Sequence, residues 1–222
     1  MRELVVSAFV SLDGVMQAPG GPEEDPTGGF AHGGWTVNYW DDSMGEAMDG
    51  LFAEPFDLLL GRKTYEIFAA HWPNIEGDPI AEAFNAVTKY VATSSAEPLA
   101  WHNSVALRGD VPMAVGRLKR KDGPKLLVQG SSVLIQALLA HDLIDELRLL
   151  VFPLVLGPGK RLFGDGTIPA ALKLVDSTTS STGVVMATYT PAGAVTTGSF
   201  ALQEPTETEL ARREKMKRED RP

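Results

Sequence analysis

The sequence contains no cysteine. This absence excludes a disulfide framework, thiolate metal ligands and a cysteine nucleophile, so packing alone must hold the fold together. Long hydrophobic runs are also missing, because no stretch approaches the roughly 18 consecutive apolar residues of a membrane-spanning helix. The apolar run at the N-terminus is short and lacks a small-residue cleavage site. We therefore expect a cytoplasmic protein, with neither secretion nor membrane insertion.

Positive charge is scarce in this chain, whose formal net charge is −9 at pH 7. A protein that binds nucleic acid neutralises many phosphates with clustered Lys and Arg, and this charge balance does not provide such a broad basic face. We therefore expect a small-molecule ligand and no nucleic-acid partner.

Three common ligand-binding patterns are absent as well. The first strand-to-helix connection lacks the Gly-x-Gly-x-x-Gly fingerprint of a Rossmann dinucleotide site, and no Gly-x4-Gly-Lys-Ser/Thr phosphate loop occurs. The histidines His32, His71, His102 and His141 lack the spacing of a metal site. The sequence thus predicts no metal and neither of these two nucleotide-binding folds.

What the sequence does contain is a repeated pattern of strands and helices. With 222 residues, 44% of them apolar, the chain can fill one sizeable core. Short apolar runs alternate with segments of helical periodicity, which is typical of a mainly parallel sheet with helices packed on it. The expected strands cover residues 3–10, 56–60, 87–92, 104–107 and 125–128. The expected helices cover residues 41–52, 64–70, 110–121 and 131–140.

The pattern changes after Asp142, where strands follow one another without long helices between them. These strands are expected at residues 146–152, 172–177 and 184–190. They predict an antiparallel end of the sheet, so the expected fold class is α/β, with a central mostly parallel sheet and antiparallel C-terminal strands. One domain of residues 1–190 is followed by a tail of residues 191–222. The tail carries six acidic and six basic residues and is expected to be a solvated helix or disordered.

Three of the expected strands end next to small, hydroxyl or cationic residues and, in two cases, a helix start. Ligands of α/β sheets bind at the carboxyl ends of strands. A helix N-terminus offers unpaired N–H groups to a phosphate, while Arg and Lys add charge and hydroxyl groups add donors. Together the segments could bind a molecule with several phosphates, although each alone could be a helix cap or a solvated surface. The segments are Gly61-Arg62-Lys63-Thr64, Thr93-Ser94-Ser95 and Gly130-Ser131-Ser132.

A long connection, residues 17–40, is rich in glycine and proline and carries Trp35, Tyr39 and Trp40. Loops of this length without regular structure usually have a function. The three aromatic rings could stack on a flat or apolar substrate, or they could anchor the loop. Both interpretations stay open.

Several stretches together match a known superfamily. The first of them is a strand that ends in S-L-D-G, and the aromatic loop follows it. Further along the chain come, in this order, the stretches L-L-L-G-R-K-T-Y-E, V-A-T-S-S, L-L-V-Q-G-S-S-V-L and F-P-L-V-L-G-P-G-K-R-L-F. Over residues 3–190 this series resembles the dihydrofolate reductase superfamily. The most similar branch contains the reductase domain of the bifunctional riboflavin-pathway deaminase-reductase, of which this chain looks like a stand-alone member. The resemblance implies a three-layer sandwich, NADPH as cofactor, and a homodimer.

The resemblance also implies a role for each segment. Residues 62–64 correspond to residues that meet the cofactor phosphates, and residues 93–94 to residues that meet the adenosine ribose-phosphate. The glycine turn before the helix at Ser131 corresponds to the turn that meets the pyrophosphate. Cations and hydroxyl groups favour the 2′-phosphate of NADPH, whereas a free ribose favours a carboxylate. A late loop corresponds to the segment that lies over the nicotinamide, where glycines permit close approach of the backbone to the flat ring. The alternative interpretation of these glycines is a sharp β-turn. The residues of this late loop are Gly157, Gly159, Leu162 and Phe163.

The identity of the proton donor stays open at this point. The superfamily places an acidic residue on the first helix after the long loop, and Asp41, Asp42, Glu46 and Asp49 all lie near that place. Asp41 is one candidate from this group. Asp13 is the other candidate because it follows the first strand, although a simple Asp-Gly turn also explains it.

The leading hypothesis is an NADPH-dependent reductase that transfers hydride to a small C=N or C=O substrate, pteridine-like, pyrimidine-like or otherwise flat. One alternative is a dihydrofolate reductase or a 5-amino-6-(5-phosphoribosylamino)uracil reductase. Against the latter, the chain has no zinc deaminase domain and carries Val15-Met16 where those enzymes commonly have a basic residue. A second alternative is a dinucleotide-binding module without turnover.

Overall fold

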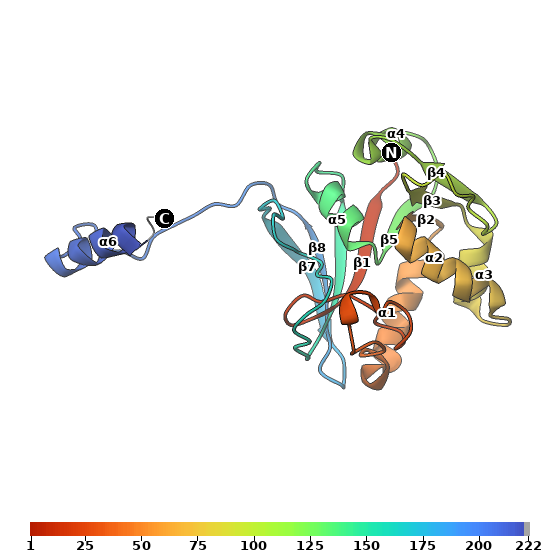
Figure 1. Ribbon diagram of the computed structural model, residues 1–222, viewed down its shortest axis with the longest axis horizontal. Coiled ribbons are helices and arrows are strands. Elements are labelled where there is room, and N and C mark those ends of the chain that lie inside the picture. Colours follow the sequence, from red (N-terminus) through yellow and green to blue (C-terminus); the bar gives the residue numbers. More distant parts are fainter. Residues whose placement is uncertain (220–222) are drawn as a thin grey trace.

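One sheet of eight strands forms the centre of the molecule in the computed structural model, which describes residues 1–219 (Figure 1). Its spatial order is β4-β3-β2-β5-β1-β6-β8-β7. The strands are β1 (Leu4–Ser11), β2 (Phe56–Gly61), β3 (Lys89–Ala92), β4 (Ser104–Leu107), β5 (Lys125–Gln129), β6 (Glu146–Phe152), β7 (Leu172–Thr179) and β8 (Val185–Pro191). The pairs from β4 to β6 are parallel, and β6, β8 and β7 pair antiparallel.

Helices cover both faces of this sheet, which makes three layers. They are α1 (Asp42–Phe52), α2 (Arg62–His71), α3 (Pro79–Ala86), α4 (Val111–Lys119), α5 (Ser132–Leu139) and, in the tail, α6 (Glu207–Glu219). Short 3-10 turns cover Thr27–Gly29, Val37–Tyr39 and Trp72–Asn74. Within residues 1–219, no helix combines the length and the apolar character needed to cross a lipid bilayer.

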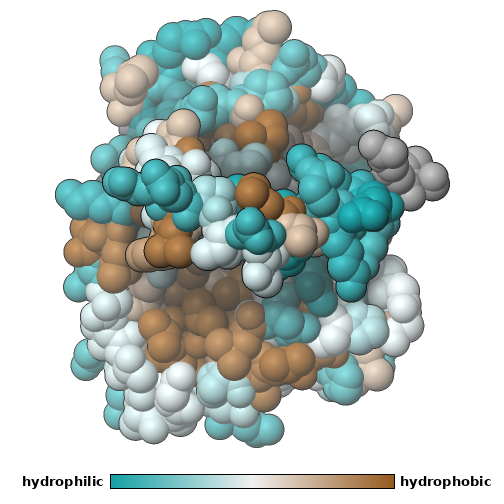
Figure 2. All heavy atoms as spheres, turned by 90° about the vertical axis from the view of Figure 1, so that its left-hand side faces the viewer, coloured by the Kyte–Doolittle hydropathy of each residue, from teal (hydrophilic) through white to brown (hydrophobic). Residues whose placement is uncertain are grey.

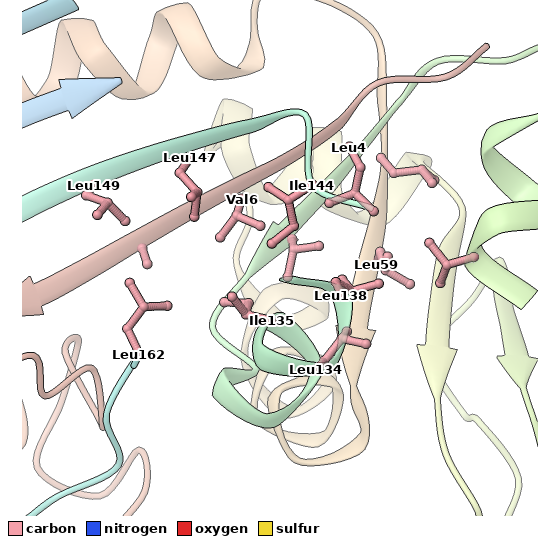
Figure 3. Packing of buried hydrophobic residues seen from close by; sticks show 14 of the residues in the cluster. Leu4, Val6, Leu59, Leu134, Ile135, Leu138, Ile144, Leu147, Leu149 and Leu162 are labelled. Atoms are coloured by element: carbon pink, nitrogen blue, oxygen red, sulfur yellow. The ribbon is translucent and has the colours of Figure 1, made fainter. Parts of the chain in front are cut away.

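The alternation of side chains along β1 explains the layers, because successive residues of a strand point to opposite faces. Leu4 and Val6 pack with α4 and α5, whereas Val5 packs with α1, α2 and α3. Figure 3 shows the first of these cores, with Ile135 and Leu138 of α5 beneath the strands. All of these apolar side chains are buried, so the central strand of the sheet is covered on both faces.

The observed fold confirms the expected α/β class, with a mostly parallel sheet and an antiparallel C-terminal end. The predicted strands and helices are present with shifts of a few residues at their ends. Helix α2 begins at Arg62, directly after β2, rather than at Thr64. The sequence interpretation assigned nothing to residues 79–86, which form α3 behind an Asp78 cap and Pro79.

The tail lies away from this body. Figure 1 shows an extended segment that leaves the end of β8 and leads to α6 at a distance from the sheet. None of the residues of α6 is buried, and its charged side chains pair along the helix. A solvated helix was one of the two states expected for this segment.

A buried ion pair ties the N-terminus to the sheet. The Arg2 guanidinium donates to the Asp57 carboxylate of β2, and its Nε donates to the Pro124 carbonyl at 2.5 Å. The Arg2 side chain is only 3% exposed, and the guanidinium lies 5.5 Å from the centre of the Tyr90 ring. Asp57 also accepts from the backbone N–H of Thr88 at 3.2 Å. This group thus connects β2, β3 and the start of β5.

Replacing Asp57 with Asn removes the counter-charge of a guanidinium that stays buried. Removing one partner of a buried ion pair costs roughly 3–5 kcal/mol, and we expect a loss of this size in the free energy of unfolding, measured by urea denaturation. Glu214→Gln, which removes an exposed partner of Lys217 on α6, is the control and should change the value by less than about 0.5 kcal/mol. Equal effects of the two substitutions would contradict this account of the pair.

Candidate functional site

The three phosphate-binding segments predicted from the sequence lie at one edge of the sheet. Strand β2 pairs in parallel with both β3 and β5, so the carboxyl ends of these three strands are neighbours. Gly61 ends β2, Thr93 follows β3, and Gly130 follows β5. Helix α2 starts at Arg62 and helix α5 at Ser132, which places two helix N-termini side by side at this edge.

Ser131 links the two helix starts directly. Its hydroxyl accepts from the backbone N–H of Gly61 at 2.8 Å and donates to the hydroxyl of Thr64 at 2.9 Å. Ser131 has a left-handed backbone with φ of 65°, and Gly130 before it has φ of 61°. A side chain at Gly130 would place its Cβ 3.0 Å from Thr64, so a small residue is needed for the two turns to approach.

The first turns of both helices keep their backbone N–H groups free of side-chain caps. Gly61 and Ser131 stand at the two N-cap positions, and within the described part of the chain no side chain caps either helix. The interpretation of Thr64 and Ser131 as ordinary caps is therefore wrong, because Thr64 lies inside α2 and the Ser131 hydroxyl points to β2. Uncapped N–H groups and the dipole of each helix favour an anion at this edge.

Arg62 lies at the start of α2 and is held by two glutamates. Its Nε donates to Glu66 at 2.6 Å, and its terminal nitrogens donate to the carboxylate of Glu97 at 3.1 Å and to the Glu97 carbonyl at 3.3 Å. The hydrogen bond to Glu66, together with both negative charges, raises the pKa of Arg62. Lys63, the next residue, is exposed.

The segment after β3 forms a compact hydroxyl-rich turn. The Thr93 hydroxyl accepts from the N–H of Ser95 at 3.0 Å, and the Ser95 hydroxyl accepts from the N–H of Glu97 at 3.1 Å. Ser94 between them is exposed. Arg108, which follows the neighbouring strand β4, donates to the Ser95 carbonyl at 2.5 Å. The sequence interpretation missed Arg108, although a cation directly after a strand beside β3 was a usable signal.

The four predicted residues of the late loop differ in their surroundings. Gly159 has φ of 157°, and a Cβ there would lie 2.6 Å from a side-chain carbon of Val15, so glycine is required. Gly157 has φ of 77° and open space around it. Leu162 is 1% exposed and belongs to the core beneath α5, whereas Phe163 is exposed. Only the glycines and Phe163 are therefore positioned to approach a ligand.

Asp13 holds the late loop to the end of β1. Its Oδ1 accepts from the Ser11 hydroxyl at 2.6 Å and from the N–H of Leu156 at 3.1 Å, and its Oδ2 accepts from the N–H of Gly157 at 2.8 Å. Arg161 lies 3.6 Å from the same Oδ2. The Ser11 hydroxyl and the two backbone donors lower the pKa of Asp13 to about 2.

Asp41 caps helix α1 and connects it to the turn between β7 and β8. Its Oδ1 accepts from the N–H of Met44 at 3.1 Å, and its Oδ2 accepts from the N–H and the hydroxyl of Ser181 at 2.8 and 2.6 Å. The hydroxyl groups of Ser181 and Ser43 hold the pKa of Asp41 well below its ordinary value. These contacts argue against the predicted role of Asp41 or Asp13 as a proton donor.

The three predicted aromatic residues separate into anchors and one accessible ring. Trp35 is buried, packs edge to face on Phe152 at 5.1 Å, and donates its indole N–H to a carbonyl at the start of the same loop. Tyr39 lies edge to face on Phe152 at 6.0 Å. Trp40 packs against Phe9 of β1 at 6.0 Å but stays 45% exposed. The structure thus favours anchoring for Trp35 and leaves Trp40 available to a substrate.

A polar network joins the long loop to the late loop. The Gln17 side chain donates to the carbonyls of Asp25 and Thr27 at 2.9 and 2.8 Å and accepts from the N–H of Lys160 at 3.0 Å. The Lys160 ammonium pairs with the Asp25 carboxylate. A hollow of about 230 Å³ between the loops is lined by Gln17, Thr27, Gly28, Phe30, Pro158, Gly159 and Lys160. These hydrogen bonds and the ion pair therefore tie the two loops together.

The residues at the sheet edge fit a dinucleotide phosphate chain. Two uncapped helix starts, cations on both sides of a hydroxyl-rich turn, and a close glycine turn supply the donors that phosphates require. Among the described residues, no group of three or more His, Asp or Glu side chains could hold a metal ion.

Comparison with known proteins shows which family the chain is similar to. A family model described as the RibD C-terminal domain matches residues 2–186. The protein YyaP of Bacillus subtilis strain 168 is 28% identical over 194 residues, which cover 85% of this chain and 94% of YyaP. The resemblance inferred from the sequence is thereby confirmed at the level of the family.

Solved structures show the same fold. A putative riboflavin biosynthesis protein from Shewanella sp. PV-4 superposes with a TM-score of 0.60 at 21% identity, covering 85% of this chain and 98% of that one. Dihydrofolate reductase from Enterococcus faecalis, solved in complex with NADP(H), superposes with a TM-score of 0.52 at 15% identity, covering 86% and 96%. The dihydrofolate reductase-like sandwich expected from the sequence is confirmed.

Asp13→Ala should release the late loop from β1. A hydrogen bond to a charged acceptor contributes roughly 1.5–3 kcal/mol, so we expect amide hydrogen exchange at Leu156 and Gly157 to accelerate about tenfold or more at pH 7. In the wild type this anchoring is fully present above the ordinary carboxyl pKa of 3.8 and is lost as the pH falls through about 2.

Asp41→Ala is the matched control, because Asp41 accepts a similar set of bonds elsewhere. It should accelerate exchange at Met44 and Ser181 and leave Leu156 unchanged. Unchanged exchange at Leu156 and Gly157 in Asp13→Ala would show that the carboxylate does not hold this loop.

Proposed function

The chain belongs to the RibD C-terminal domain family, and we propose from this that it is an NADPH-dependent reductase. Its substrate would be a small, flat C=N or C=O compound of the pyrimidine or pteridine type. The observation that carries the proposal is the meeting of three donor-rich strand ends at one sheet edge.

In the proposed cofactor site, different parts of the dinucleotide contact different segments along this edge of the sheet. The turn at Gly130 and Ser131 and the first turn of α5 would hold the pyrophosphate, because their N–H groups are uncapped. Arg62 and Lys63, with the hydroxyl groups after β3, would meet the phosphate of the adenosine end. The complex of the Enterococcus faecalis enzyme with NADP(H) supports a nicotinamide cofactor in this fold.

When bound, the nicotinamide supplies the hydride, and the chain contributes orientation and exclusion of water. The late loop would lie over the ring, with Gly157 and Gly159 allowing close backbone approach. Asp13 would act as a positioning residue, since its carboxylate fixes the start of this loop. Trp40 would present its exposed ring to a flat substrate.

We propose that water, rather than Asp13 or Asp41, supplies the proton. A general acid must hold a proton near the working pH, and both carboxylates stay ionised among their donors. The same observation favours one alternative function, a dinucleotide-binding module without turnover. NADPH oxidation with a panel of carbonyl and imine compounds separates the two functions.

We also propose that the protein is a homodimer, with β7 in the contact. Strand β7 is the outermost strand on one side of the sheet, and almost all of its residues are exposed. Figure 2, which views the molecule from the side of β7 and β8, shows a broad hydrophobic area on that surface. Leu174, Val175 and Val185 are exposed apolar residues of these two strands. An uncovered edge strand has unpaired backbone N–H and C=O groups and is a template for pairing with another chain.

Arg62→Ala should weaken NADPH binding and affect NADH much less, because only NADPH carries the 2′-phosphate that this guanidinium would bind. Loss of a charged hydrogen-bonding group predicts a decrease in NADPH affinity of roughly tenfold or more, measured by titration of cofactor fluorescence. Arg213→Ala on the exposed helix α6 is the control. Failure of the wild type to bind either cofactor would remove the basis of the reductase proposal.

Leu174→Lys combined with Val175→Lys should weaken the dimer, because like charges would then face each other across the contact. Sedimentation velocity should show a dimer for the wild type and a dissociation constant raised about tenfold or more in the variant. Val195→Lys, an exposed apolar position in the tail, is the control. A monomeric wild type at micromolar concentration would contradict the assembly.

A further inference from the structure

The Arg62 guanidinium already donates to two carboxylates and one backbone carbonyl. Glu66 takes its Nε, and Glu97 takes both terminal nitrogens, one through the carboxylate at 3.1 Å and one through the carbonyl at 3.3 Å. A phosphate binds Arg best through this fork of parallel N–H groups. The Arg62 side chain is 20% exposed, and a phosphate that takes the terminal fork competes with Glu97 for these nitrogens.

The two parts of Glu97 are held differently. Its backbone is fixed from two sides, since its N–H bonds the Ser95 hydroxyl and its carbonyl bonds Arg62. Arg108 anchors the same turn through the Ser95 carbonyl. The Glu97 side chain, by contrast, is 75% exposed, and within residues 1–219 its carboxylate bonds Arg62 alone. Because exposed ion pairs contribute little, the side chain can turn away while the loop stays in place.

A carboxylate at this position acts oppositely on the two nicotinamide dinucleotides. The 2′-phosphate of NADPH is an anion, which a nearby carboxylate repels and which needs the arginine fork. The free 2′-hydroxyl of NADH is a hydrogen-bond donor, and a carboxylate can accept its hydrogen bond. A side chain that switches between Arg62 and a ribose hydroxyl therefore favours NADH and disfavours NADPH.

We propose that Glu97 sets the cofactor selectivity of this protein, by competing with the 2′-phosphate for Arg62. The inference rests on the proposed function, because it requires the adenosine end of a nicotinamide dinucleotide to lie at residues 93–97. NADPH binds only when the Glu97 carboxylate leaves the guanidinium. NADH binds with that carboxylate beside its 2′-hydroxyl.

Glu66 provides a matched control for the loss of one negative charge beside Arg62. It lies four residues later on α2 and bonds only the Nε, so its removal leaves the terminal fork with Glu97. Glu66→Gln should therefore change the ratio of the two affinities by less than about twofold. The comparison separates competition for the fork from a general change in charge.

The test is titration of the wild type, Glu97→Gln and Glu66→Gln with NADPH and NADH, followed by cofactor fluorescence. Glu97→Gln should bind NADPH roughly fivefold more tightly and NADH roughly threefold more weakly. Competition titrations with 2′,5′-ADP and 5′-AMP should repeat these opposite shifts, because they probe the adenosine end without the nicotinamide.

The outcomes distinguish the two proposals. Binding of both cofactors with an unchanged affinity ratio in Glu97→Gln overturns the role of Glu97 and leaves the reductase proposal intact. Equal effects of Glu66→Gln and Glu97→Gln overturn the competition for the fork. Absence of binding of either cofactor to the wild type overturns the proposed function, and this inference with it.

Discussion

The parallel pairing of β2 with β3 and β5 is the constraint on which the candidate site depends. Parallel strands run in one direction, so their carboxyl ends lie at the same edge, and Gly61, Thr93 and Gly130 meet there from distant parts of the chain. The hydroxyl of Ser131 then joins the starts of α2 and α5 through Gly61 and Thr64. Without this register, the donors would be isolated surface groups.

Local positive charge at this edge would allow an acidic protein to bind an anionic ligand. The chain carries a net charge of −9, so attraction for phosphates must come from a local group of cations and helix N-termini. Arg62 and Arg108 both contact the turn after β3. Glu97 offsets part of that charge at the same place. The balance between Arg62 and Glu97, rather than the overall charge, then determines which dinucleotide is favoured.

Much of the fold and the position of the site could be predicted from the sequence, because periodicity and strand-end residues are local signals. Helix α3 was not predicted because eight residues give only a short periodic signal, although Asp78 before Pro79 marks its start. The actual contacts of Asp13 could not be predicted, since Leu156 and Gly157 lie more than 140 residues away. Long-range packing likewise decided that one tryptophan of the aromatic loop is buried and another exposed.

The most direct test of the central claim, that one sheet edge binds a nicotinamide dinucleotide, is to map the backbone amides by NMR with NADP⁺. The account predicts chemical-shift changes gathered at residues 61–64, 93–97, 130–133 and 156–159, with β7 and α6 unaffected. Changes concentrated on other elements, or none at saturating ligand, would contradict it.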